Sequence, residues 1–177
     1  MNERSRERGY VHIYTGDGKG KTTAALGLTL RAVGAGWRVF WGQFLKEGEF
    51  SEIKAMRSFG GQVVVQQYGA GRFIRGRPCE EDIKLARKGF DEIKGIVRGG
   101  LYDMVVMDEI NVAMHYGLIG FDEMKELLES RPSGVEIILT GRWADETLFK
   151  DADVVTEMRC IKHYYERGIT ARVGVEK

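Results

Sequence analysis

A glycine-rich segment, Thr-Gly-Asp-Gly-Lys-Gly-Lys-Thr-Thr, occupies residues 15–23, directly after a β-branched and aromatic run at 10–14. The mostly apolar residues that follow predict a helix that ends near Gly34. A strand, a glycine-rich turn and a helix in this order can bind phosphate, because the N–H groups of the turn and the helix dipole converge on an anion. The segment therefore predicts a triphosphate-binding loop.

Two residues of the loop carry side chains suited to a nucleotide. Lys21 would place its ammonium on the phosphates, and the Thr22 hydroxyl would complete the shell of a Mg²⁺ ion. The general pattern is G-x-x-x-x-G-K-[ST], and Thr15 stands here at its first glycine position. The loop is therefore a variant, which indicates a particular subfamily.

Strand-like runs alternate with helical ones along the rest of the chain. This alternation predicts an α/β fold with a doubly wound, mostly parallel sheet of six strands. We expect strands at 10–14, 38–44, 62–66, 104–108, 136–140 and 154–157, and helices at 21–33, 51–58, 80–98, 121–130 and 145–149. We expect a charged N-terminal tail at 1–9 and a single domain at 10–177.

Length, charge and hydropathy limit the classes of function. A chain of 177 residues that is 43% hydrophobic suits one domain with a substantial core. A net charge of +1 gives no support to a nucleic-acid or membrane partner. No apolar run approaches the roughly 20 residues of a membrane span. The N-terminus is charged where a signal peptide needs an apolar stretch, so we expect a cytoplasmic protein.

Two carboxylates, Asp108 and Glu109, follow the apolar run at 104–107. Ligands of open α/β sheets bind beyond the carboxyl ends of the strands, so these acids should emerge beside the loop. Such a pair can hold Mg²⁺ directly or through water. The alternative is an acidic helix N-cap after a buried strand. The phosphate loop favours the metal role.

These residues together resemble a known family. Residues 15–25 are similar to the variant phosphate loop of the cob(I)alamin adenosyltransferases, or ATP:corrinoid adenosyltransferases, of the P-loop cobalamin-biosynthesis family. The resemblance runs from about residue 10 to 176, through blocks at 106–113, 138–142, 152–159, 161–164 and 168–172. It implies a RecA-like P-loop fold and a homodimer.

The resemblance also implies a reaction. The cobalt of a reduced corrinoid attacks the 5′ carbon of ATP and expels triphosphate, with Mg²⁺ as cofactor and a reductase as the source of electrons. It implies catalytic roles for Lys21 and Glu109, and a metal site of Thr22 and Glu109 with Asp108 in support. The residues that we expect to bind ATP are Gly16, Asp17, Gly18, Lys19, Gly20, Lys21, Thr22, Thr23 and Arg142.

A corrinoid face is expected in the segment 68–77. In the family, aromatic residues after the third strand displace the lower axial base of the corrinoid. This segment departs from the Phe-x-Trp pair of some members, which leaves Phe73 as the predicted wedge. The alternative is that Phe73 only anchors the loop to the core. His115 and Arg142 are further candidates for contacts with a ligand.

Two other classes of function stay open at this point. One is a RecA-like ATPase or switch, in which Glu109 orients an attacking water. It would release orthophosphate without a corrinoid. The other is a nucleotide-gated corrinoid-binding protein, which would retain a corrinoid without turnover.

Overall fold

The fold is built around one parallel sheet. A computed structural model describes residues 8–71 and 76–177. Its six strands lie in the order β3-β2-β4-β5-β1-β6, and every pair is parallel, which confirms the predicted α/β class. The strands are β1 (Val11–Thr15), β2 (Val39–Phe44), β3 (Val63–Tyr68), β4 (Met104–Asp108), β5 (Glu136–Thr140) and β6 (Val154–Glu157).

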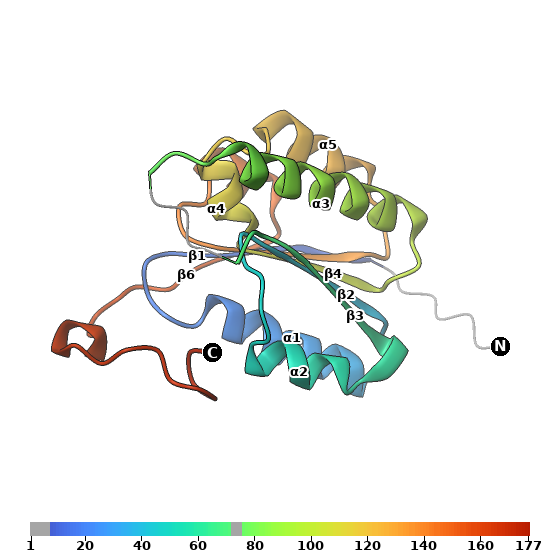
Figure 1. Cartoon of the computed structure of the whole chain (residues 1–177). Helices are drawn as coiled ribbons and strands as arrows, with labels where there is room; N and C mark the ends of the chain where they lie inside the picture. Colours follow the sequence, from blue (N-terminus) through green and yellow to red (C-terminus); the bar gives the residue numbers. More distant parts are fainter. Residues whose placement is uncertain (1–7, 72–75) are drawn as a thin grey trace.

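Helices cover both faces of the sheet, as a doubly wound fold requires. Helices α1 and α2 lie on one face, and α3, α4 and α5 lie on the other (Figure 1). The α-helices are α1 (Lys21–Gly34), α2 (Ser51–Arg57), α3 (Glu80–Gly99), α4 (Ile110–His115) and α5 (Phe121–Ser130). Among the described residues no helix has both the length and the apolar character needed to cross a membrane.

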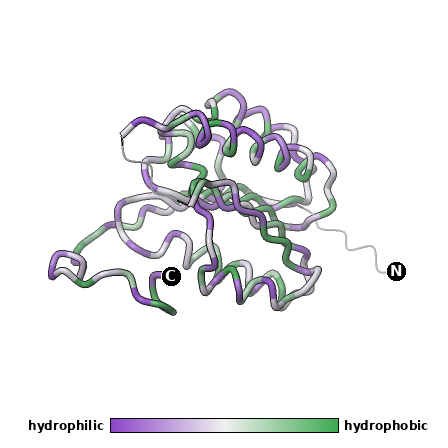
Figure 2. The backbone as a smooth tube through the Cα atoms, viewed as in Figure 1, coloured by the Kyte–Doolittle hydropathy of each residue, from purple (hydrophilic) through white to green (hydrophobic). Residues whose placement is uncertain are grey.

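The sheet has a separate hydrophobic core on each face. Every residue of β2 and β4 is buried, because helices cover both sides of these central strands. Successive side chains of a strand point to opposite faces. Val106 accordingly packs with α1 and α2, and Met107 packs with the core beneath α3 and α5. Figure 2 shows hydrophobic residues along the central strands, with hydrophilic and hydrophobic residues alternating along the helices.

Most predicted elements are confirmed. All six strands and four of the helices lie within two residues of their expected bounds. The segment expected to be helical at 145–149 forms the 3₁₀ helix η2 (Glu146–Asp151). Three short elements had no predicted bounds, namely α4, η1 (Gly60–Gln62) and η3 (Tyr164–Arg167), although the alternative N-cap role of the acid pair implied a helix after β4. Helix α4 has only six residues and directly follows an apolar strand, so its own periodicity is too short to detect.

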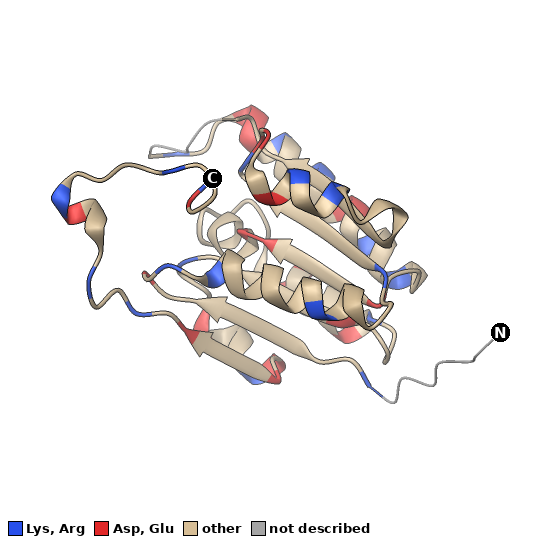
Figure 3. Ribbon diagram, turned by 90° about the horizontal axis from the view of Figure 1, so that it is seen from below, with Lys and Arg blue, Asp and Glu red and all other residues tan. Residues whose placement is uncertain are grey.

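The C-terminal segment returns to the body of the protein after β6. It extends away from the sheet and then turns back toward the loop that precedes α1 (Figure 3). Two contacts fix its end: Glu176 pairs with Lys19, and the Ser51 hydroxyl donates to the carbonyl of Lys177 at 3.0 Å. Because all six strands are parallel, their carboxyl ends meet at one edge of the sheet, and the C-terminus closes over this edge.

Candidate functional site

The glycine-rich loop lies between β1 and α1, as predicted. Gly16 and Gly20 have positive φ angles of 96° and 118°, which glycine adopts without strain. A Cβ on Gly16 would lie 2.4 Å from the carbonyl oxygen of Met158. The Gly18 N–H donates to that same oxygen at 2.6 Å. The segment after β6 therefore packs tightly against the loop and determines its shape.

The Lys21 side chain folds across the loop that precedes it. Its ammonium donates to the carbonyl oxygens of Gly16 at 2.6 Å and Gly18 at 2.7 Å. Burial and the nearby Arg142 guanidinium lower the pKa of Lys21. Arg142 itself is exposed and donates to the carbonyl oxygen of Asp17 at 3.3 Å. The structure thus brings Lys21 and Arg142, two predicted ATP-binding residues, to the same loop.

Lys19 has acidic and aromatic partners from the C-terminal segment. Its ammonium donates to the Tyr164 hydroxyl at 2.5 Å and pairs with the Glu176 carboxylate. A cavity of about 270 Å³ lies here, lined by loop residues 17–23, by Glu109 and Arg142, and by His163, Val175 and Glu176. Any anion that binds Lys19 through this cavity competes with Glu176.

Asp108 is the buried acid of the site. It is fully buried, and three side chains donate to its carboxylate: Thr22 at 2.9 Å, Thr140 at 2.7 Å and Gln43 at 3.0 Å. Burial would raise the pKa of Asp108, but the Lys46 ammonium and the three hydrogen bonds outweigh it and lower the pKa. Asp108 is therefore an ionised carboxylate that orients the Thr22 hydroxyl.

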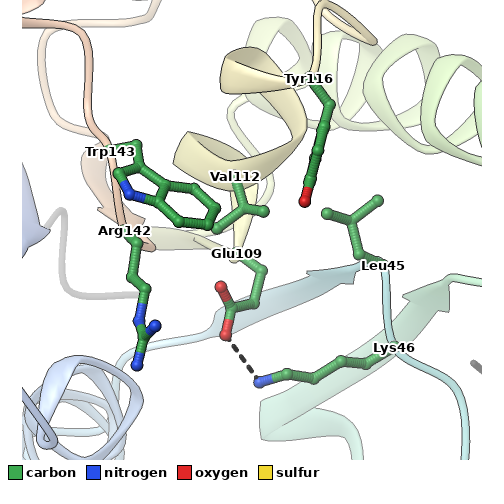
Figure 4. Close-up of a pocket in the computed structure, with 7 residues that line it drawn as sticks. All are labelled: Leu45, Lys46, Glu109, Val112, Tyr116, Arg142 and Trp143. Carbon is green, nitrogen blue, oxygen red and sulfur yellow. Dashed lines mark ion pairs between the residues drawn. The ribbon is translucent and has the colours of Figure 1, made fainter. Parts of the chain in front are cut away.

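Glu109 stands at the N-cap position of helix α4, but its side chain does not cap the helix. Its φ angle of 61° is left-handed, and its side chain makes no capping hydrogen bond, so the alternative role as a helix cap is not supported. Its N–H donates to the Thr140 hydroxyl at 3.1 Å, which ties its backbone to β5. The Glu109 carboxylate instead lies 3.0 Å from the Lys46 ammonium (Figure 4). The Lys46 ammonium also lies 3.6 Å from Asp108.

The oxygen atoms of Thr22, Asp108 and Glu109 suit Mg²⁺, a hard cation. Within 8–71 and 76–177, no group of three or more His, Cys, Asp or Glu side chains could hold a metal. Mg²⁺ needs no such cage, because it is usually held by one or two carboxylates, water and substrate phosphates. The residues present therefore fit Mg²⁺.

A second cavity of about 390 Å³ adjoins the phosphate loop. It shares Glu109 and Arg142 with the loop cavity, and its other lining residues are Leu45, Lys46, Val112, Tyr116 and Trp143 (Figure 4). Leu45, Lys46, Tyr116 and Trp143 were not among the predicted site residues. Leu45 and Lys46 directly follow β2, so their place beyond a parallel strand was the available signal.

His115 and Phe73 were also predicted to contact a ligand. His115 does not line either cavity. It contacts the Trp143 ring at a centroid distance of 4.6 Å and borders a separate cavity of about 290 Å³. Phe73, the predicted corrinoid wedge, lies outside the described residues.

Comparisons with known proteins agree with the geometry. Residues 7–176 match the family model of the ATP:corrinoid adenosyltransferases BtuR/CobO/CobP. A corrinoid adenosyltransferase of a Sinorhizobium species is 35% identical over 99% of this chain and 84% of its own length. The corrinoid adenosyltransferases of Escherichia coli K12 and Salmonella typhimurium are 33% and 34% identical, each over 96% of this chain and 86% of the relative. This chain belongs to the ATP:corrinoid adenosyltransferase family.

Proposed function

We infer that this protein transfers the 5′-deoxyadenosyl group of ATP to the cobalt of a reduced corrinoid, and releases triphosphate. The family match over 7–176 carries this inference. The geometry supports it, because the loop, Asp108, Glu109 and Arg142 all lie at one edge of the sheet, as a nucleotide site requires.

The chemistry determines what the protein must supply. A cobalt–carbon bond forms, the bond between the 5′ carbon and oxygen breaks, and its electron pair leaves on the triphosphate. Cobalt(I) is a strong nucleophile, so the step needs no general base. The protein contributes alignment of the two substrates and stabilisation of the negative charge on the leaving group.

We propose that the cations of the site stabilise that charge. Lys21 and the loop N–H groups would bind the triphosphate, together with Lys19 and Arg142. Mg²⁺ would be held by Thr22 and Glu109, with Asp108 in support, and would neutralise part of the charge on the phosphates. The hydrogen bond from Thr22 to Asp108 at 2.9 Å supports this arrangement, because it holds the hydroxyl at the start of α1.

The other expected features remain proposals. We propose a cytoplasmic homodimer that receives electrons from a reductase, as the family resemblance implies. All four residues of the edge strand β6 are exposed, and this open edge of the sheet supports the proposal of a second copy that pairs with it. Phe73 stays the predicted residue for displacement of the axial base, and cobalamin and cobinamide are both possible substrates.

Phosphorus NMR of the products tests the function. The protein is mixed with ATP, Mg²⁺ and chemically reduced cob(I)alamin, and the products are measured together with the absorbance of the corrinoid. We expect adenosylcobalamin and intact triphosphate in equal amounts, because no phosphoanhydride bond breaks. Formation of ADP and orthophosphate at a corrinoid-independent rate would instead show an ATPase. Retention of the corrinoid without a cobalt–carbon product would show a binding protein.

A further inference from the structure

Backbone strain is concentrated around the second cavity. Among the described residues, three that are not glycine have a left-handed backbone: Leu45 at φ 60°, Glu109 at 61° and Trp143 at 57°. All three line the cavity of about 390 Å³. Such conformations are unfavourable for bulky side chains and are typical of functional sites, where the surrounding structure enforces them. Their coincidence indicates that this cavity binds a ligand.

Trp143 and Tyr116 form the aromatic part of the cavity lining. The Trp143 ring lies against His115, with centroids 4.6 Å apart and planes inclined by 33°, and meets Tyr116 edge-on at 82°. The His115 ring thus packs against the indole without lining this cavity. Trp143 nevertheless remains 46% exposed. Figure 4 shows the Tyr116 hydroxyl pointing toward Leu45, with Val112 between the two rings and the polar residues below.

The lining of the cavity suits a flat group attached to an anion. Its aromatic and aliphatic residues stand away from the phosphate loop, while Lys46, Glu109 and Arg142 face it. Glu109 and Arg142 also line the loop cavity, so the two spaces adjoin. A nucleotide with its phosphates in the loop can therefore place its base beside Trp143. A volume of about 390 Å³ accommodates a nucleoside, whereas a complete corrinoid, with its peripheral amide side chains, has several times as many atoms as a nucleoside.

An aromatic residue on the other side of the loop is less suited to stack on the base. Tyr164 has the Lys19 ammonium 5.1 Å and the Arg172 guanidinium 4.8 Å from its ring centroid. Its hydroxyl also donates to Glu176. The Tyr164 ring is therefore already engaged by two cations, whereas the ring contacts of Trp143 leave nearly half of that residue exposed.

We propose that Trp143 is a base-binding residue, on which the adenine of ATP stacks in the cavity between Trp143 and Val112. Tyr116 closes the end of this cavity, and Arg142 lies where the base-bearing part of the nucleotide joins the triphosphate. The proposal rests on the proposed function in that ATP is taken as the nucleotide. It adds a determinant of nucleotide affinity that acts separately from the phosphate loop.

Two ligands distinguish the contribution of the base to binding from that of the phosphates. They are ATP and inorganic triphosphate, and the binding of each is measured by calorimetry. Trp143→Ala should weaken ATP binding by about 5- to 150-fold, the range for loss of one base–aromatic stack, and should leave triphosphate binding unchanged. Trp143→Phe keeps a ring and should retain most of the ATP affinity. Equal weakening of the binding of both ligands would overturn the proposal, since it would show that Trp143 supports the loop.

Tryptophan fluorescence tests the same contact, first in the wild-type protein and then in two conservative variants. The chain has three tryptophans, and Trp41 is fully buried. ATP should quench the wild-type emission more than triphosphate does, and Trp143→Phe should abolish that difference. Trp37→Phe, a change at the amino end of β2, is the matched control and should preserve it. An ATP-specific quench that survives Trp143→Phe would contradict the proposal.

Steady-state kinetics distinguish the base from the corrinoid. Trp143→Ala should raise the KM for ATP and leave the KM for cobalamin unchanged. A raised KM for cobalamin with normal ATP binding would overturn the proposal and place the corrin on the indole. If the protein bound ATP through Trp143 but formed no adenosylcobalamin, the stacking inference would stand and the proposed function would fail.

Discussion

Replacement of Lys46 tests whether the charge network of the site is as tightly coupled as its geometry indicates. The Lys46 ammonium lies 3.0 Å from Glu109 and 3.6 Å from the fully buried Asp108, and only 27% of its side chain is exposed. Lys46→Met keeps most of the apolar volume and removes the charge. It leaves two neighbouring carboxylates without their cation.

The expected cost follows from this burial. Removal of one partner from a buried ion pair typically destabilises a protein by 3–5 kcal/mol, because the other charge stays buried and unpaired. Lys46 retains some contact with solvent, so we expect the lower end, a loss of about 3 kcal/mol in the free energy of unfolding at neutral pH. Three hydrogen bonds to Asp108 remain in the variant and prevent a larger loss.

Urea denaturation followed by circular dichroism measures the loss, provided that the slope with denaturant is unchanged. The matched control is Lys125→Met, which removes a more exposed ion pair with Glu129 at 3.8 Å and should cost less than about 1 kcal/mol. Lys46→Arg keeps the charge and should cost less than Lys46→Met. The reasoning is refuted if Lys46→Met costs no more than Lys125→Met.

The effect of Lys46→Met should depend on pH. The pKa of Asp108 is lowered in the folded protein, so its contribution to stability is present above its unfolded value of about 3.9 and is lost as pH falls through the native pKa. The pKa of Lys46 is raised: burial alone would lower it, but Asp108 and Glu109 outweigh burial. Its contribution is present below about 10.4 and is lost as pH rises through the native pKa. The difference between wild type and variant should thus be largest between these limits.

Three further substitutions test the nucleotide site. Lys21→Ala should lose a charge-assisted contact of about 1.5–3 kcal/mol, measured as weaker ATP binding and slower turnover, and unchanged values would remove Lys21 from the mechanism. Glu109→Gln should lower activity in a way that higher Mg²⁺ partly restores, and full activity at low Mg²⁺ would exclude Glu109 as a ligand. Glu176→Gln should tighten the binding of inorganic triphosphate, because Glu176 pairs with Lys19, and equal or weaker binding would argue against this competition.

The helices and strands were predictable because each has a sequence pattern that is contained in one continuous segment. Helices such as α3, with 20 residues, and strands such as β4, with five buried residues, have clear periodicity or continuous apolar character. The order of the strands was not predicted, since it depends on contacts between distant segments. The path of the C-terminal segment was also not predictable, because it depends on long-range contacts such as that of Glu176 with Lys19.

The site was predictable where one motif contains the chemistry. The phosphate loop and the acid pair are each a contiguous motif in the sequence. The structure brings the two motifs together at one edge of the sheet, where Thr22 donates a hydrogen bond to Asp108. Lys46 and Trp143 lie in no recognisable motif. They reach the site because the left-handed turns at Leu45 and Trp143 redirect the chain after β2 and β5, and a single sequence gives no sign of these turns at residues other than glycine.

The charges of the site divide into two groups with different partners. Lys46 is neutralised by Asp108 and Glu109, and Lys19 by Glu176. Lys21 and Arg142 instead contact only backbone carbonyls of the loop among the hydrogen bonds and ion pairs of the described residues. Their mutual repulsion contributes to the lowered pKa of Lys21, and a bound polyanion would relieve it. We therefore propose that Lys21 and Arg142 bind the triphosphate without first giving up an acidic partner, whereas Lys19 must exchange Glu176 for it. Alkyl transfer requires the loop to hold the triphosphate as an intact leaving group.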